Sequence, residues 1–582
     1  MAIMFQERAI DRQFASFICQ QSGEVTCDLF RLIVSLLSNA VGKGSICLNL
    51  AHYAGETVSV DGKEMVFPDV DTLRELLRGK STMGLPGQHR PLILDTSDRL
   101  YLYRYWRYEQ ELAGRILQKA SSDAGGIDEQ VLHEGLARLF PECSEEKMDH
   151  QKVAASVALH KQFCVISGGP GTGKTSTVVR ILALLLEQKG VSKQQIAMTT
   201  PTGKATARLK ASVNDIRPIL DCSEEIKLAI PDNVVTIQRL LGAVSGSSRF
   251  RYCALNPLPF DTVIVDEASM IALPLMCALV EALKPTARLI LLGDKDQLAS
   301  VEAGAVLGDI CTAGEEGIQA SSLSSSLVKL EKNHRFQAGT GIAEISRTVN
   351  TGLDREALAL LKSGTLNGIA WQELPPREEL RRLLTKKVVE GFQGYLSADS
   401  PSKALEYFDS FRILCALRDG PYGALGLNSS VESILRREGL ISQESRGYRG
   451  RPILVTVNDY SMQLFNGDSG ILFPDPDSGG ALRAFFPDPE GGVRSIMPER
   501  LPLHETAFAM TVHKSQGSEF NHVLMLLPPV DSDILTRELI YTGITRAKES
   551  VEIWGSDGVF CRAVRKKTER QSGLKEALLT SI

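Results

Sequence analysis

"FCVISGGPGTGKTSTVVRILALLLEQ" is the sequence of residues 163–188, and this segment indicates the fold class. Residues 163–167 are predicted to form a short buried strand, and a glycine-rich segment comes directly after them. From Lys174 onward, apolar side chains keep a helical spacing at Val178, Ile181, Leu182 and Leu185. A strand, a glycine loop and a helix in this order are the context of a P-loop, so we predict an α/β nucleotide-binding core.

The glycine-rich segment, GGPGTGKT, matches the P-loop pattern G-x-x-x-x-G-K-[ST] at every position. Glycines let backbone N–H groups approach phosphates, and the N-terminus of the following helix favours an anion. Lys174 is expected to reach the β- and γ-phosphates, and Thr175 is expected to hold Mg²⁺. The predicted nucleotide-binding residues here are Gly168, Gly169, Pro170, Gly171, Thr172, Gly173, Lys174 and Thr175. A P-loop alone does not indicate how the energy of hydrolysis is used.

A second apolar strand, in "FDTVIVDEASMI" (260–271), ends in two carboxylates. If it lies beside the P-loop in a parallel sheet, Asp266 can hold Mg²⁺ through water. Glu267 can then orient or deprotonate the attacking water. A simple acidic turn is the alternative, and the P-loop upstream makes that alternative less favoured.

Two further strands are predicted to end in polar groups. "ARLILLGDKDQLASV" (287–301) places Asp294 and Gln297 where they can sense a γ-phosphate. "QIAMTTPTGKATARL" (195–209) adds a strand and then a loop that contains Thr, Lys and Arg. Because binding sites of parallel α/β sheets lie at the carboxyl ends of their strands, these segments predict a RecA-like core.

Composition limits the possible classes of protein. The 582 residues suggest three or four domains, and 43% hydrophobic with 23% charged residues is ordinary for a globular protein. The net charge of −5 argues against gripping nucleic acid by bulk charge, so any contact must be local. Eleven scattered cysteines without a C-x-x-C pair argue against a zinc ribbon, an Fe–S cluster or a disulfide framework. We expect a cytoplasmic protein whose basic segment 562–573 is a solvated end.

The series of motifs resembles that of the superfamily-one helicases, in order along the chain. "MDHQKVAASVAL" (148–159) is similar to the glutamine motif, with Gln151 reading adenine, and "TIQRLLG" (236–242) is similar to motif Ib. "LEKNHRF" (330–336) resembles motif IV, "TVHKSQGSEF" (511–520) motif V and "ELIYTGITRAKE" (538–549) motif VI. The segments already described resemble motifs I, Ia, II and III.

This resemblance implies two RecA-like domains, with ATP between them and a single strand of nucleic acid across their tops. Arg335 and Arg546 would come from the second side of the cleft and neutralise charge on the transferring phosphate. Gly517 and Glu519 would face the nucleotide. The residues that the resemblance assigns to DNA are Thr202, Lys204, Gln238, His513, Lys514, Ser515 and Gln516. The implied cofactors are ATP and Mg²⁺.

Three stretches resemble the RecD family, the alpha subunits of RecBCD-type exodeoxyribonuclease V. They are "ILCALRDGPYGALGLN" (413–428), "PILVTVNDYSMQLFNGDSGIL" (452–472) and "RFRYCALNPLPFD" (249–261), the last like that family's pin hairpin. The resemblance implies a 5′-to-3′ DNA helicase that processes double-strand ends with RecB-like and RecC-like subunits, the nuclease lying in a partner. Gln238 stands where the family pattern leads us to expect histidine. A stand-alone B-type helicase acting on DNA or RNA, or a DNA-binding ATPase switch without translocation, are the alternatives.

The positions of these motifs determine the expected domain organisation. A mainly helical N-terminal docking domain and linker would cover 1–140, and the first RecA-like domain 145–335, with a pin at about 243–260. The second would cover 336–430 and 505–582, interrupted at 431–504 by an SH3-like β-barrel. Aromatic residues at 101–108 could stack on bases, but a domain core or a partner interface is favoured over that interpretation.

Overall fold

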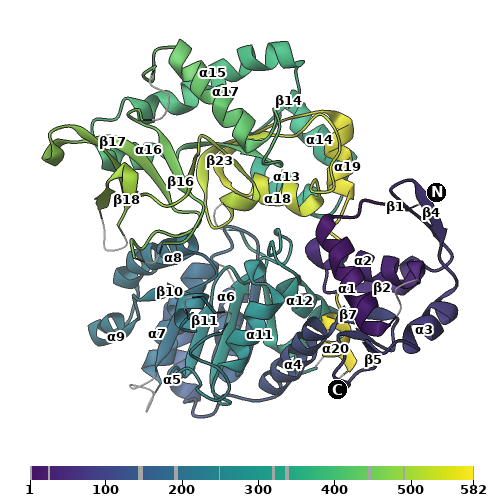
Figure 1. The fold of residues 1–582 in the computed structure, drawn as a ribbon. Coiled ribbons are helices and arrows are strands. Elements are labelled where there is room, and N and C mark those ends of the chain that lie inside the picture. The colour runs from purple at the N-terminus through teal and green to yellow at the C-terminus, as the bar shows by residue number, and fades with distance from the viewer. Residues whose placement is uncertain are drawn as a thin grey trace.

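In this computed structural model, the chain is described over residues 3–23, 27–141, 149–188, 195–244, 246–247, 249–317, 321–333, 340–443, 447–459, 461–488 and 492–580. Two α/β lobes lie one above the other in Figure 1, and an N-terminal domain lies to the right at their junction. Among the described helices, none is both long enough and apolar enough to cross a bilayer.

The first lobe is built on a six-stranded parallel sheet with the strand order β10-β9-β11-β12-β8-β13. Its strands are β8 (Phe163–Gly168), β9 (Ile196–Thr200), β10 (Val234–Thr236), β11 (Thr262–Val265), β12 (Arg288–Gly293) and β13 (Leu327–Leu330). Its helices are α6 (His150–His160), α7 (Lys174–Glu187), α8 (Gly203–Ile216), α9 (Glu224–Ala229), α10 (Ile237–Leu240), α11 (Leu273–Glu281) and α12 (Val306–Glu316). Helices cover both faces, which is why the central strands are continuous apolar runs.

The second lobe repeats this design with a five-stranded parallel sheet of order β14-β23-β22-β15-β21. Its strands are β14 (Ile369–Glu373), β15 (Phe411–Cys415), β21 (Ala509–Thr511), β22 (Phe520–Leu526) and β23 (Ala547–Gly555). Its helices are α13 (Gly341–Asn350), α14 (Asp354–Ser363), α15 (Arg377–Leu396), α16 (Pro401–Phe408), α17 (Ala424–Arg437), α18 (Arg537–Ile544) and α19 (Asp557–Arg565). The prediction of two parallel α/β sheets is confirmed.

An antiparallel sheet is inserted between the neighbouring strands β15 and β21. It has the order β19-β18-β17-β16-β20 and consists of β16 (Pro452–Val455), β17 (Ser469–Asp475), β18 (Ala481–Pro487), β19 (Val493–Ile496) and β20 (His504–Thr506). Helix α17 packs on β21 and so belongs to the second lobe, which places the start of the insertion after 431. Within the described residues the edge strands β19 and β20 do not pair, so the sheet is open where a barrel was expected.

The N-terminal domain combines helices with two small sheets. The helices are α1 (Ala9–Ser22), α2 (Asp28–Gly42) and α3 (Val70–Arg78). One sheet contains β1 (Ile3–Phe5), β3 (Thr57–Val60) and β4 (Lys63–Val66), and the other contains β2 (Cys47–Asn49), β5 (Met83–Gly84), β6 (Leu92–Leu94) and β7 (Arg99–Leu102). A core that includes Phe30, Phe67 and Leu73 joins these elements.

The first lobe begins earlier than expected, because helix α4 (Tyr103–Ala120) packs along α11. Tyr101, Tyr105 and Leu112 are buried in one core with the strands of the first sheet. Of the interpretations of the aromatic cluster, the structure therefore supports a core. The expected linker is also held in place, since the Ala124 N–H donates to the His160 carbonyl at 2.7 Å. Helix α5 (Glu129–Leu139) then packs against α7.

Two other segments complete the lobes. The expected pin at 243–260 is a short irregular hairpin in which Ala243 pairs with Phe250, and Cys253 with Asn256. The last helix, α20 (Leu574–Thr580), leaves the second lobe and packs on α4 and α12. Helix α20, which follows the segment 562–573 that was expected to be a solvated end, is therefore buried against the first lobe, because Leu574 and Leu578 complete that lobe's core.

Because α4 is part of the first lobe's core, Leu112→Ala should destabilise the first lobe itself. The side chain is fully buried, and removing it should lower the free energy of unfolding by about 2 to 5 kcal/mol. The midpoint of thermal unfolding measures this loss. Leu228→Ala on α9 is the control, since that side chain is 82% exposed and should shift the midpoint little. An unchanged midpoint of thermal unfolding for Leu112→Ala would show that α4 does not contribute to the core of the first lobe.

Candidate active site

The P-loop lies between β8 and α7, as the sequence predicted. Gly171 and Gly173 have φ values of 83° and 80°, a region that favours glycine. A Cβ on Gly173 would also clash with the side-chain amide of Gln151. The Lys174 ammonium donates to the carbonyls of Gly168 and Gly169 at 2.6 and 3.0 Å. It therefore lies across the loop that is expected to receive the phosphates.

Gln151, expected to read adenine, is bound to the P-loop in this structure. Its Nε2 donates to the Thr172 carbonyl at 3.1 Å, and its Oε1 accepts from Arg180 Nη1 at 3.1 Å. Both partners lie in the elements that carry the P-loop. The glutamine thus connects α6 to the phosphate-binding loop and to α7.

The two carboxylates after β11 lie at the carboxyl edge of the first sheet. Val265 pairs with Thr199 on one side and Leu291 on the other, so the strands end together. Glu267 has a φ of 53°, which is uncommon for a residue with a side chain, and its N–H donates to Asp266 Oδ1 at 2.8 Å. Burial, together with the neighbouring Glu267, raises the pKa of Asp266 to about 6. Two adjacent carboxylates in a buried site are a donor set that favours a cation.

A hydrogen-bonded circuit joins the motif III loop of the first lobe to helix α18 and the residues after it in the second. Asp294 Oδ2 accepts from Gln297 Nε2 and from the Tyr541 hydroxyl, both at 3.0 Å. Gln297 Oε1 in turn accepts from Arg546 Nη2 at 3.1 Å. All four side chains are buried, and burial raises the pKa of Asp294. The circuit fixes which end of the Gln297 amide faces Arg546.

Three more contacts cross between the lobes near this circuit. The Leu298 N–H donates to Thr542 Oγ1 at 3.0 Å, and the Leu298 carbonyl accepts from Gln516 Nε2 at 2.8 Å. Arg208 on α8 forms an ion pair with Glu519. Glu519 and Gly517 therefore lie at the junction of the lobes, and a Cβ on Gly517 would be 3.6 Å from Ala205.

The residues predicted to contact DNA come from both lobes. Thr202 Oγ1 caps α8 by accepting from the Ala205 N–H at 3.3 Å, and Gln238 lies half-buried on α10. Lys204 is half-buried with its ammonium 5.9 Å from the Phe520 ring, and burial lowers its pKa to about 8. Lys514 is paired with Glu505 at 2.7 Å.

The polar side chains of the motif V loop differ in how deeply they are buried. His513 begins the short turn His513–Ser515 and is half-buried, and burial lowers its pKa. Ser515 is fully buried, and its hydroxyl donates to the Val512 carbonyl at 2.7 Å. Gln516 is buried against the first lobe. The family resemblance assigned Ser515 and Gln516 to DNA, and in this structure their polar groups are hydrogen-bonded within the protein.

The sequence interpretation missed Tyr541 and Arg208, although each lies inside a motif that was identified. Tyr541 comes five residues before Arg546, and Arg208 four residues after Lys204. A tyrosine in a buried helix is ordinary core, and only the tertiary structure brings its hydroxyl to Asp294. The remaining predicted residue, Arg335, lies outside the described residues.

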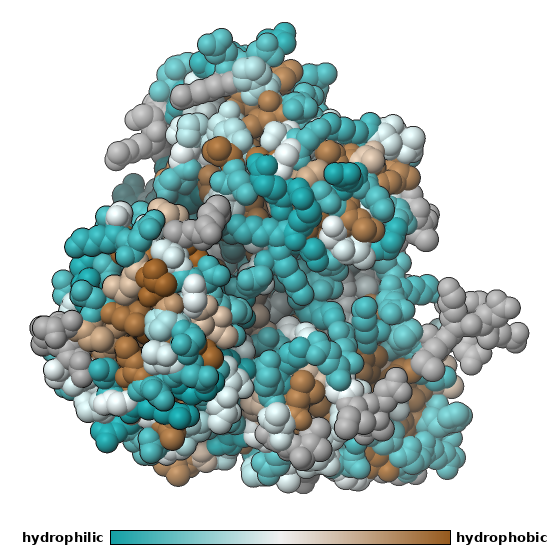
Figure 2. Space-filling view, turned by 90° about the vertical axis from the view of Figure 1, so that its right-hand side faces the viewer, coloured by the Kyte–Doolittle hydropathy of each residue, from teal (hydrophilic) through white to brown (hydrophobic). Residues whose placement is uncertain are grey.

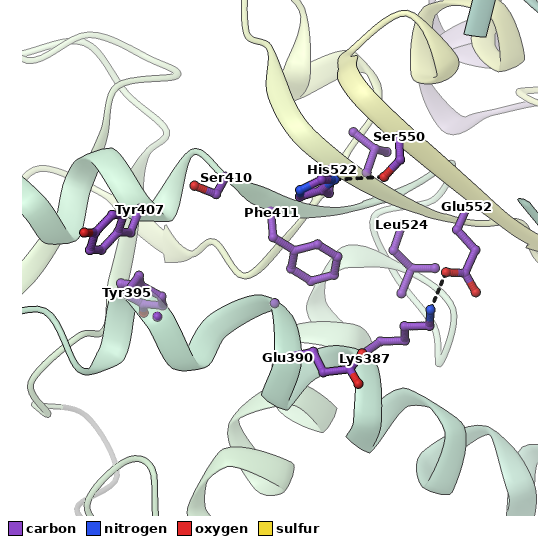
Figure 3. A pocket seen from close by; sticks show the side chains of 13 residues that line it. Lys387, Glu390, Tyr395, Tyr407, Ser410, Phe411, His522, Leu524, Ser550 and Glu552 are labelled. Carbon is purple, nitrogen blue, oxygen red and sulfur yellow. Dashed lines mark hydrogen bonds and ion pairs between the residues drawn. The ribbon is translucent and has the colours of Figure 1, made fainter. Parts of the chain in front are cut away.

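A separate cavity of about 430 Å³ lies in the second lobe, between α15 and the beginnings of β15, β22 and β23 (Figure 3). Lys387 and Glu552 form an ion pair at 2.6 Å on its wall, and His522 is hydrogen-bonded to Ser550 at 2.8 Å. Since the motif V loop comes after the carboxyl end of β21, this cavity is at the opposite edge of the sheet. It is not part of the nucleotide site.

Family models and relatives match the chain in the same order as its domains. A "RecBCD enzyme subunit RecD, N-terminal domain" matches residues 7–101, an "AAA domain" 151–303 and a "UvrD-like helicase C-terminal domain" 506–553. The RecBCD enzyme subunit RecD of Mycolicibacterium smegmatis is 39% identical over 94% of this chain and 93% of that protein. The ATP-dependent RecD2 DNA helicase of Deinococcus radiodurans is 29% identical over 82% of this chain and 58% of that protein. Bacteroides Pif1 bound to ssDNA superposes with a TM-score of 0.38 at 14% identity, covering 70% of this chain and 92% of that one.

The circuit between the lobes makes a prediction for Tyr541→Phe. Loss of the hydroxyl removes one donor to Asp294, and the maximal rate of nucleotide hydrolysis should fall about 3- to 10-fold, the value of one hydrogen bond. The KM for the nucleotide should change little, because the P-loop is untouched. Tyr395→Phe is the matched control, since that buried hydroxyl donates to the Gly450 carbonyl within the second lobe and its insertion. Equal rates for both variants would contradict a role for the circuit in hydrolysis.

Proposed function

Since the chain belongs to the RecD family of RecBCD helicase–nuclease subunits and is an ATP-dependent superfamily-one DNA helicase, we propose that it moves 5′ to 3′ along one strand of a double-strand DNA end. It would do so within a cytoplasmic heterotrimer with RecB-like and RecC-like subunits, whose nuclease lies in a partner. The observation that carries a motor function is the contact of Gln297 with Arg546, because it connects the nucleotide edge of one lobe to the other lobe. A motor needs hydrolysis to depend on how the lobes meet.

In the proposed reaction, Lys174 binds the β- and γ-phosphates and Gln297 and Arg546 respond to the γ-phosphate. Arg335 would add a second positive charge from the same side. Glu267 would orient the attacking water and accept its proton, because its neighbour Asp266 is committed to the metal. The buried Arg546 would offset charge on the phosphate only while the lobes are in contact.

Thr175 and Asp266 would hold the Mg²⁺ that this reaction needs. Burial raises the pKa of Asp266, and a cation bound beside it would offset the cost of burying its charge. No cluster of three or more His, Cys, Asp or Glu side chains suited to a metal occurs in the described part of the chain. A hydroxyl and one carboxylate fit an ion that takes its other oxygen ligands from phosphates and water. When bound, Mg²⁺ would neutralise phosphate charge.

The single strand would cross the top of the two lobes at the motif Ia and motif V loops. Thr202, Lys204 and Gln238 from the first lobe, with His513 and Lys514 from the second, are our candidates for backbone contacts. Contacts of this kind do not read base identity, so binding should tolerate sequence and weaken with salt. Ser515 and Gln516 would act indirectly, since Gln516 already connects this loop to Leu298.

The N-terminal domain is our candidate for the surface that docks on a RecC-like subunit. Met4, Ile10, Phe17 and Val66 are between 56% and 79% exposed and lie on β1, α1 and β4. Figure 2 views the molecule from the side of this domain and shows hydrophobic patches on a mainly hydrophilic surface. Exposed apolar side chains of this size gain from a partner's cover. This proposal replaces the aromatic residues 101–108 as the docking face, because they are packed within this chain.

Two alternative functions, a stand-alone helicase and an ATPase switch, can be distinguished from this proposal by experiment. A stand-alone helicase is disfavoured because this chain is 39% identical to the M. smegmatis RecD subunit and 29% identical to the D. radiodurans RecD2 helicase, and residues 7–101 match the RecD N-terminal domain. An ATPase switch would use the same nucleotide site without moving. Co-purification with two large subunits supports the heterotrimer, and purification alone as an active helicase supports the stand-alone enzyme.

Lys174→Gln should stop ATP hydrolysis while leaving the fold intact. The variant loses the ammonium that lies on the P-loop, and DNA-stimulated turnover should fall by about 100-fold or more. The glycines still form the loop, so thermal stability should stay close to wild type. Lys403→Gln on α16 is a control for the loss of one surface charge and should keep full activity. Near-normal turnover by Lys174→Gln would show that the nucleotide binds elsewhere.

Polarity and translocation can be tested with a streptavidin block on a single strand. A 5′-to-3′ motor should displace streptavidin from the 3′ end of the strand in the presence of ATP and leave a 5′ block in place. Displacement of streptavidin from the 5′ end alone would show that the motor moves 3′ to 5′. An enzyme that hydrolyses ATP on DNA but displaces neither block would be the ATPase switch.

A further inference from the structure

Residues 568–573, between α19 and α20, touch the second lobe, the first lobe and the N-terminal domain. Thr568 bonds to Glu538 of α18 through its N–H and its hydroxyl, at 3.0 and 2.7 Å. Arg570 then contacts the first lobe, Gln571 contacts the N-terminal domain, and Ser572 and Gly573 bond to Glu109 of α4. We name this segment the C-terminal strap. The sequence predicted only a solvated basic end here.

Arg570 binds the loop that comes directly after Gln297. Its guanidinium donates to the carbonyls of Ser300, Gly304 and Glu302 at 2.5, 2.9 and 3.0 Å. One planar cation therefore holds three carbonyls of a five-residue segment at a fixed spacing, which a flexible lysine cannot do. Between Gln297 and Ser300, Leu298 is buried in the core of the second lobe.

The same strap is attached to the N-terminal domain by the next residue. The Gln571 carbonyl accepts from the Ile46 N–H at 2.7 Å, and its side-chain oxygen accepts from the Asn49 N–H at 2.7 Å. The domain also reaches the motif III loop directly, since the Gly304 N–H donates to the Gly44 carbonyl at 3.0 Å. A displacement of the N-terminal domain would thus pull on Arg570 and on Gly304 together.

We propose that Arg570 is a positioning residue that holds the motif III loop so that Gln297 meets Arg546, and that the strap links this loop to the N-terminal domain. Through the strap, the rate of ATP hydrolysis would depend on the position of the N-terminal domain relative to the first lobe. The link to a partner rests on the proposed function, in which that domain docks on a RecC-like subunit. The role of Arg570 in hydrolysis does not depend on a partner.

The position of Arg570 also explains an effect on motif V. Its charge adds to burial in lowering the pKa of His513, so the electrostatic influence of the guanidinium extends to the motif V turn. The loop that carries Gln297 is thus in contact with this cation, and the loop that carries Gln516 is within reach of its charge. Loss of that cation would leave the 300–304 carbonyls without this donor, so the motif III loop could move. A displacement of about 1 Å in the reacting groups can lower the rate of hydrolysis strongly.

The test compares Arg570→Gln, Arg570→Lys and the control Lys567→Gln in the full chain, with DNA-stimulated ATP hydrolysis measured over a range of ATP. Arg570→Gln should lower kcat by about 10-fold with KM for ATP within about 2-fold of wild type. Arg570→Lys should recover part of the loss, because the charge returns without the planar fork. Lys567 is exposed, and Lys567→Gln should keep wild-type kinetics.

Hydrogen exchange of the same proteins supplies a readout that does not need activity. Arg570→Gln should speed exchange of the amides at 299–305 while those of β11 stay protected. Gln571→Ala, which keeps Arg570, should give a smaller change in the same direction and covers the case in which Arg570→Gln fails to fold. Wild-type kcat and unchanged exchange in the Arg570 and Gln571 variants would overturn the proposal. A wild-type protein without DNA-stimulated hydrolysis would instead contradict the proposed function.

Discussion

The arrangement of the two lobes depends on four buried polar side chains that satisfy one another: Asp294, Gln297, Tyr541 and Arg546. A buried polar group without a partner costs free energy, so each of these groups needs the other lobe in place. This requirement makes the contact between lobes specific in a way that apolar packing alone would not. It also places an arginine of one lobe beside the glutamine of the other at the edge where the P-loop lies. In the proposed reaction, hydrolysis and lobe contact would therefore use the same two side chains.

Packing around this circuit shows that the domains are less separate than their order in the chain suggests. Helix α4 comes after the N-terminal domain in sequence but is buried with the first sheet, and α20 comes after the second lobe but packs on α4 and α12. The first lobe is therefore completed by one helix that precedes its strands in the sequence and one that follows the second lobe. A partner that moved the N-terminal domain would act on this shared core and not on a flexible appendage.

Local patterns predicted the parts of the site that a short segment encodes by itself. The P-loop, Asp266 with Glu267, and the loop after β12 each come after an apolar strand, and parallel pairing brings the ends of these strands to one edge. Each prediction needed only the period of the hydrophobic residues and the chemistry of the polar residues next to them. The family resemblance, and not a local pattern, assigned Ser515 and Gln516 to DNA. The structure shows both side chains buried, because neighbouring residues decide which way a polar side chain in a short turn points.

The amino-acid sequence was sufficient for the two parallel sheets, the nucleotide loop and the family, because these are repeated patterns of strand, glycine and acid over short distances. Tertiary structure alone decided the partner of Tyr541, the ion pair of Arg208 with Glu519, the burial of Tyr101 and Tyr105, and the path of the C-terminal strap. Each of these is a contact between residues that are far apart in the chain. Helical periodicity predicts that one face of α4 or α20 is buried, but it does not say against which element, since any apolar surface of matching shape would satisfy it.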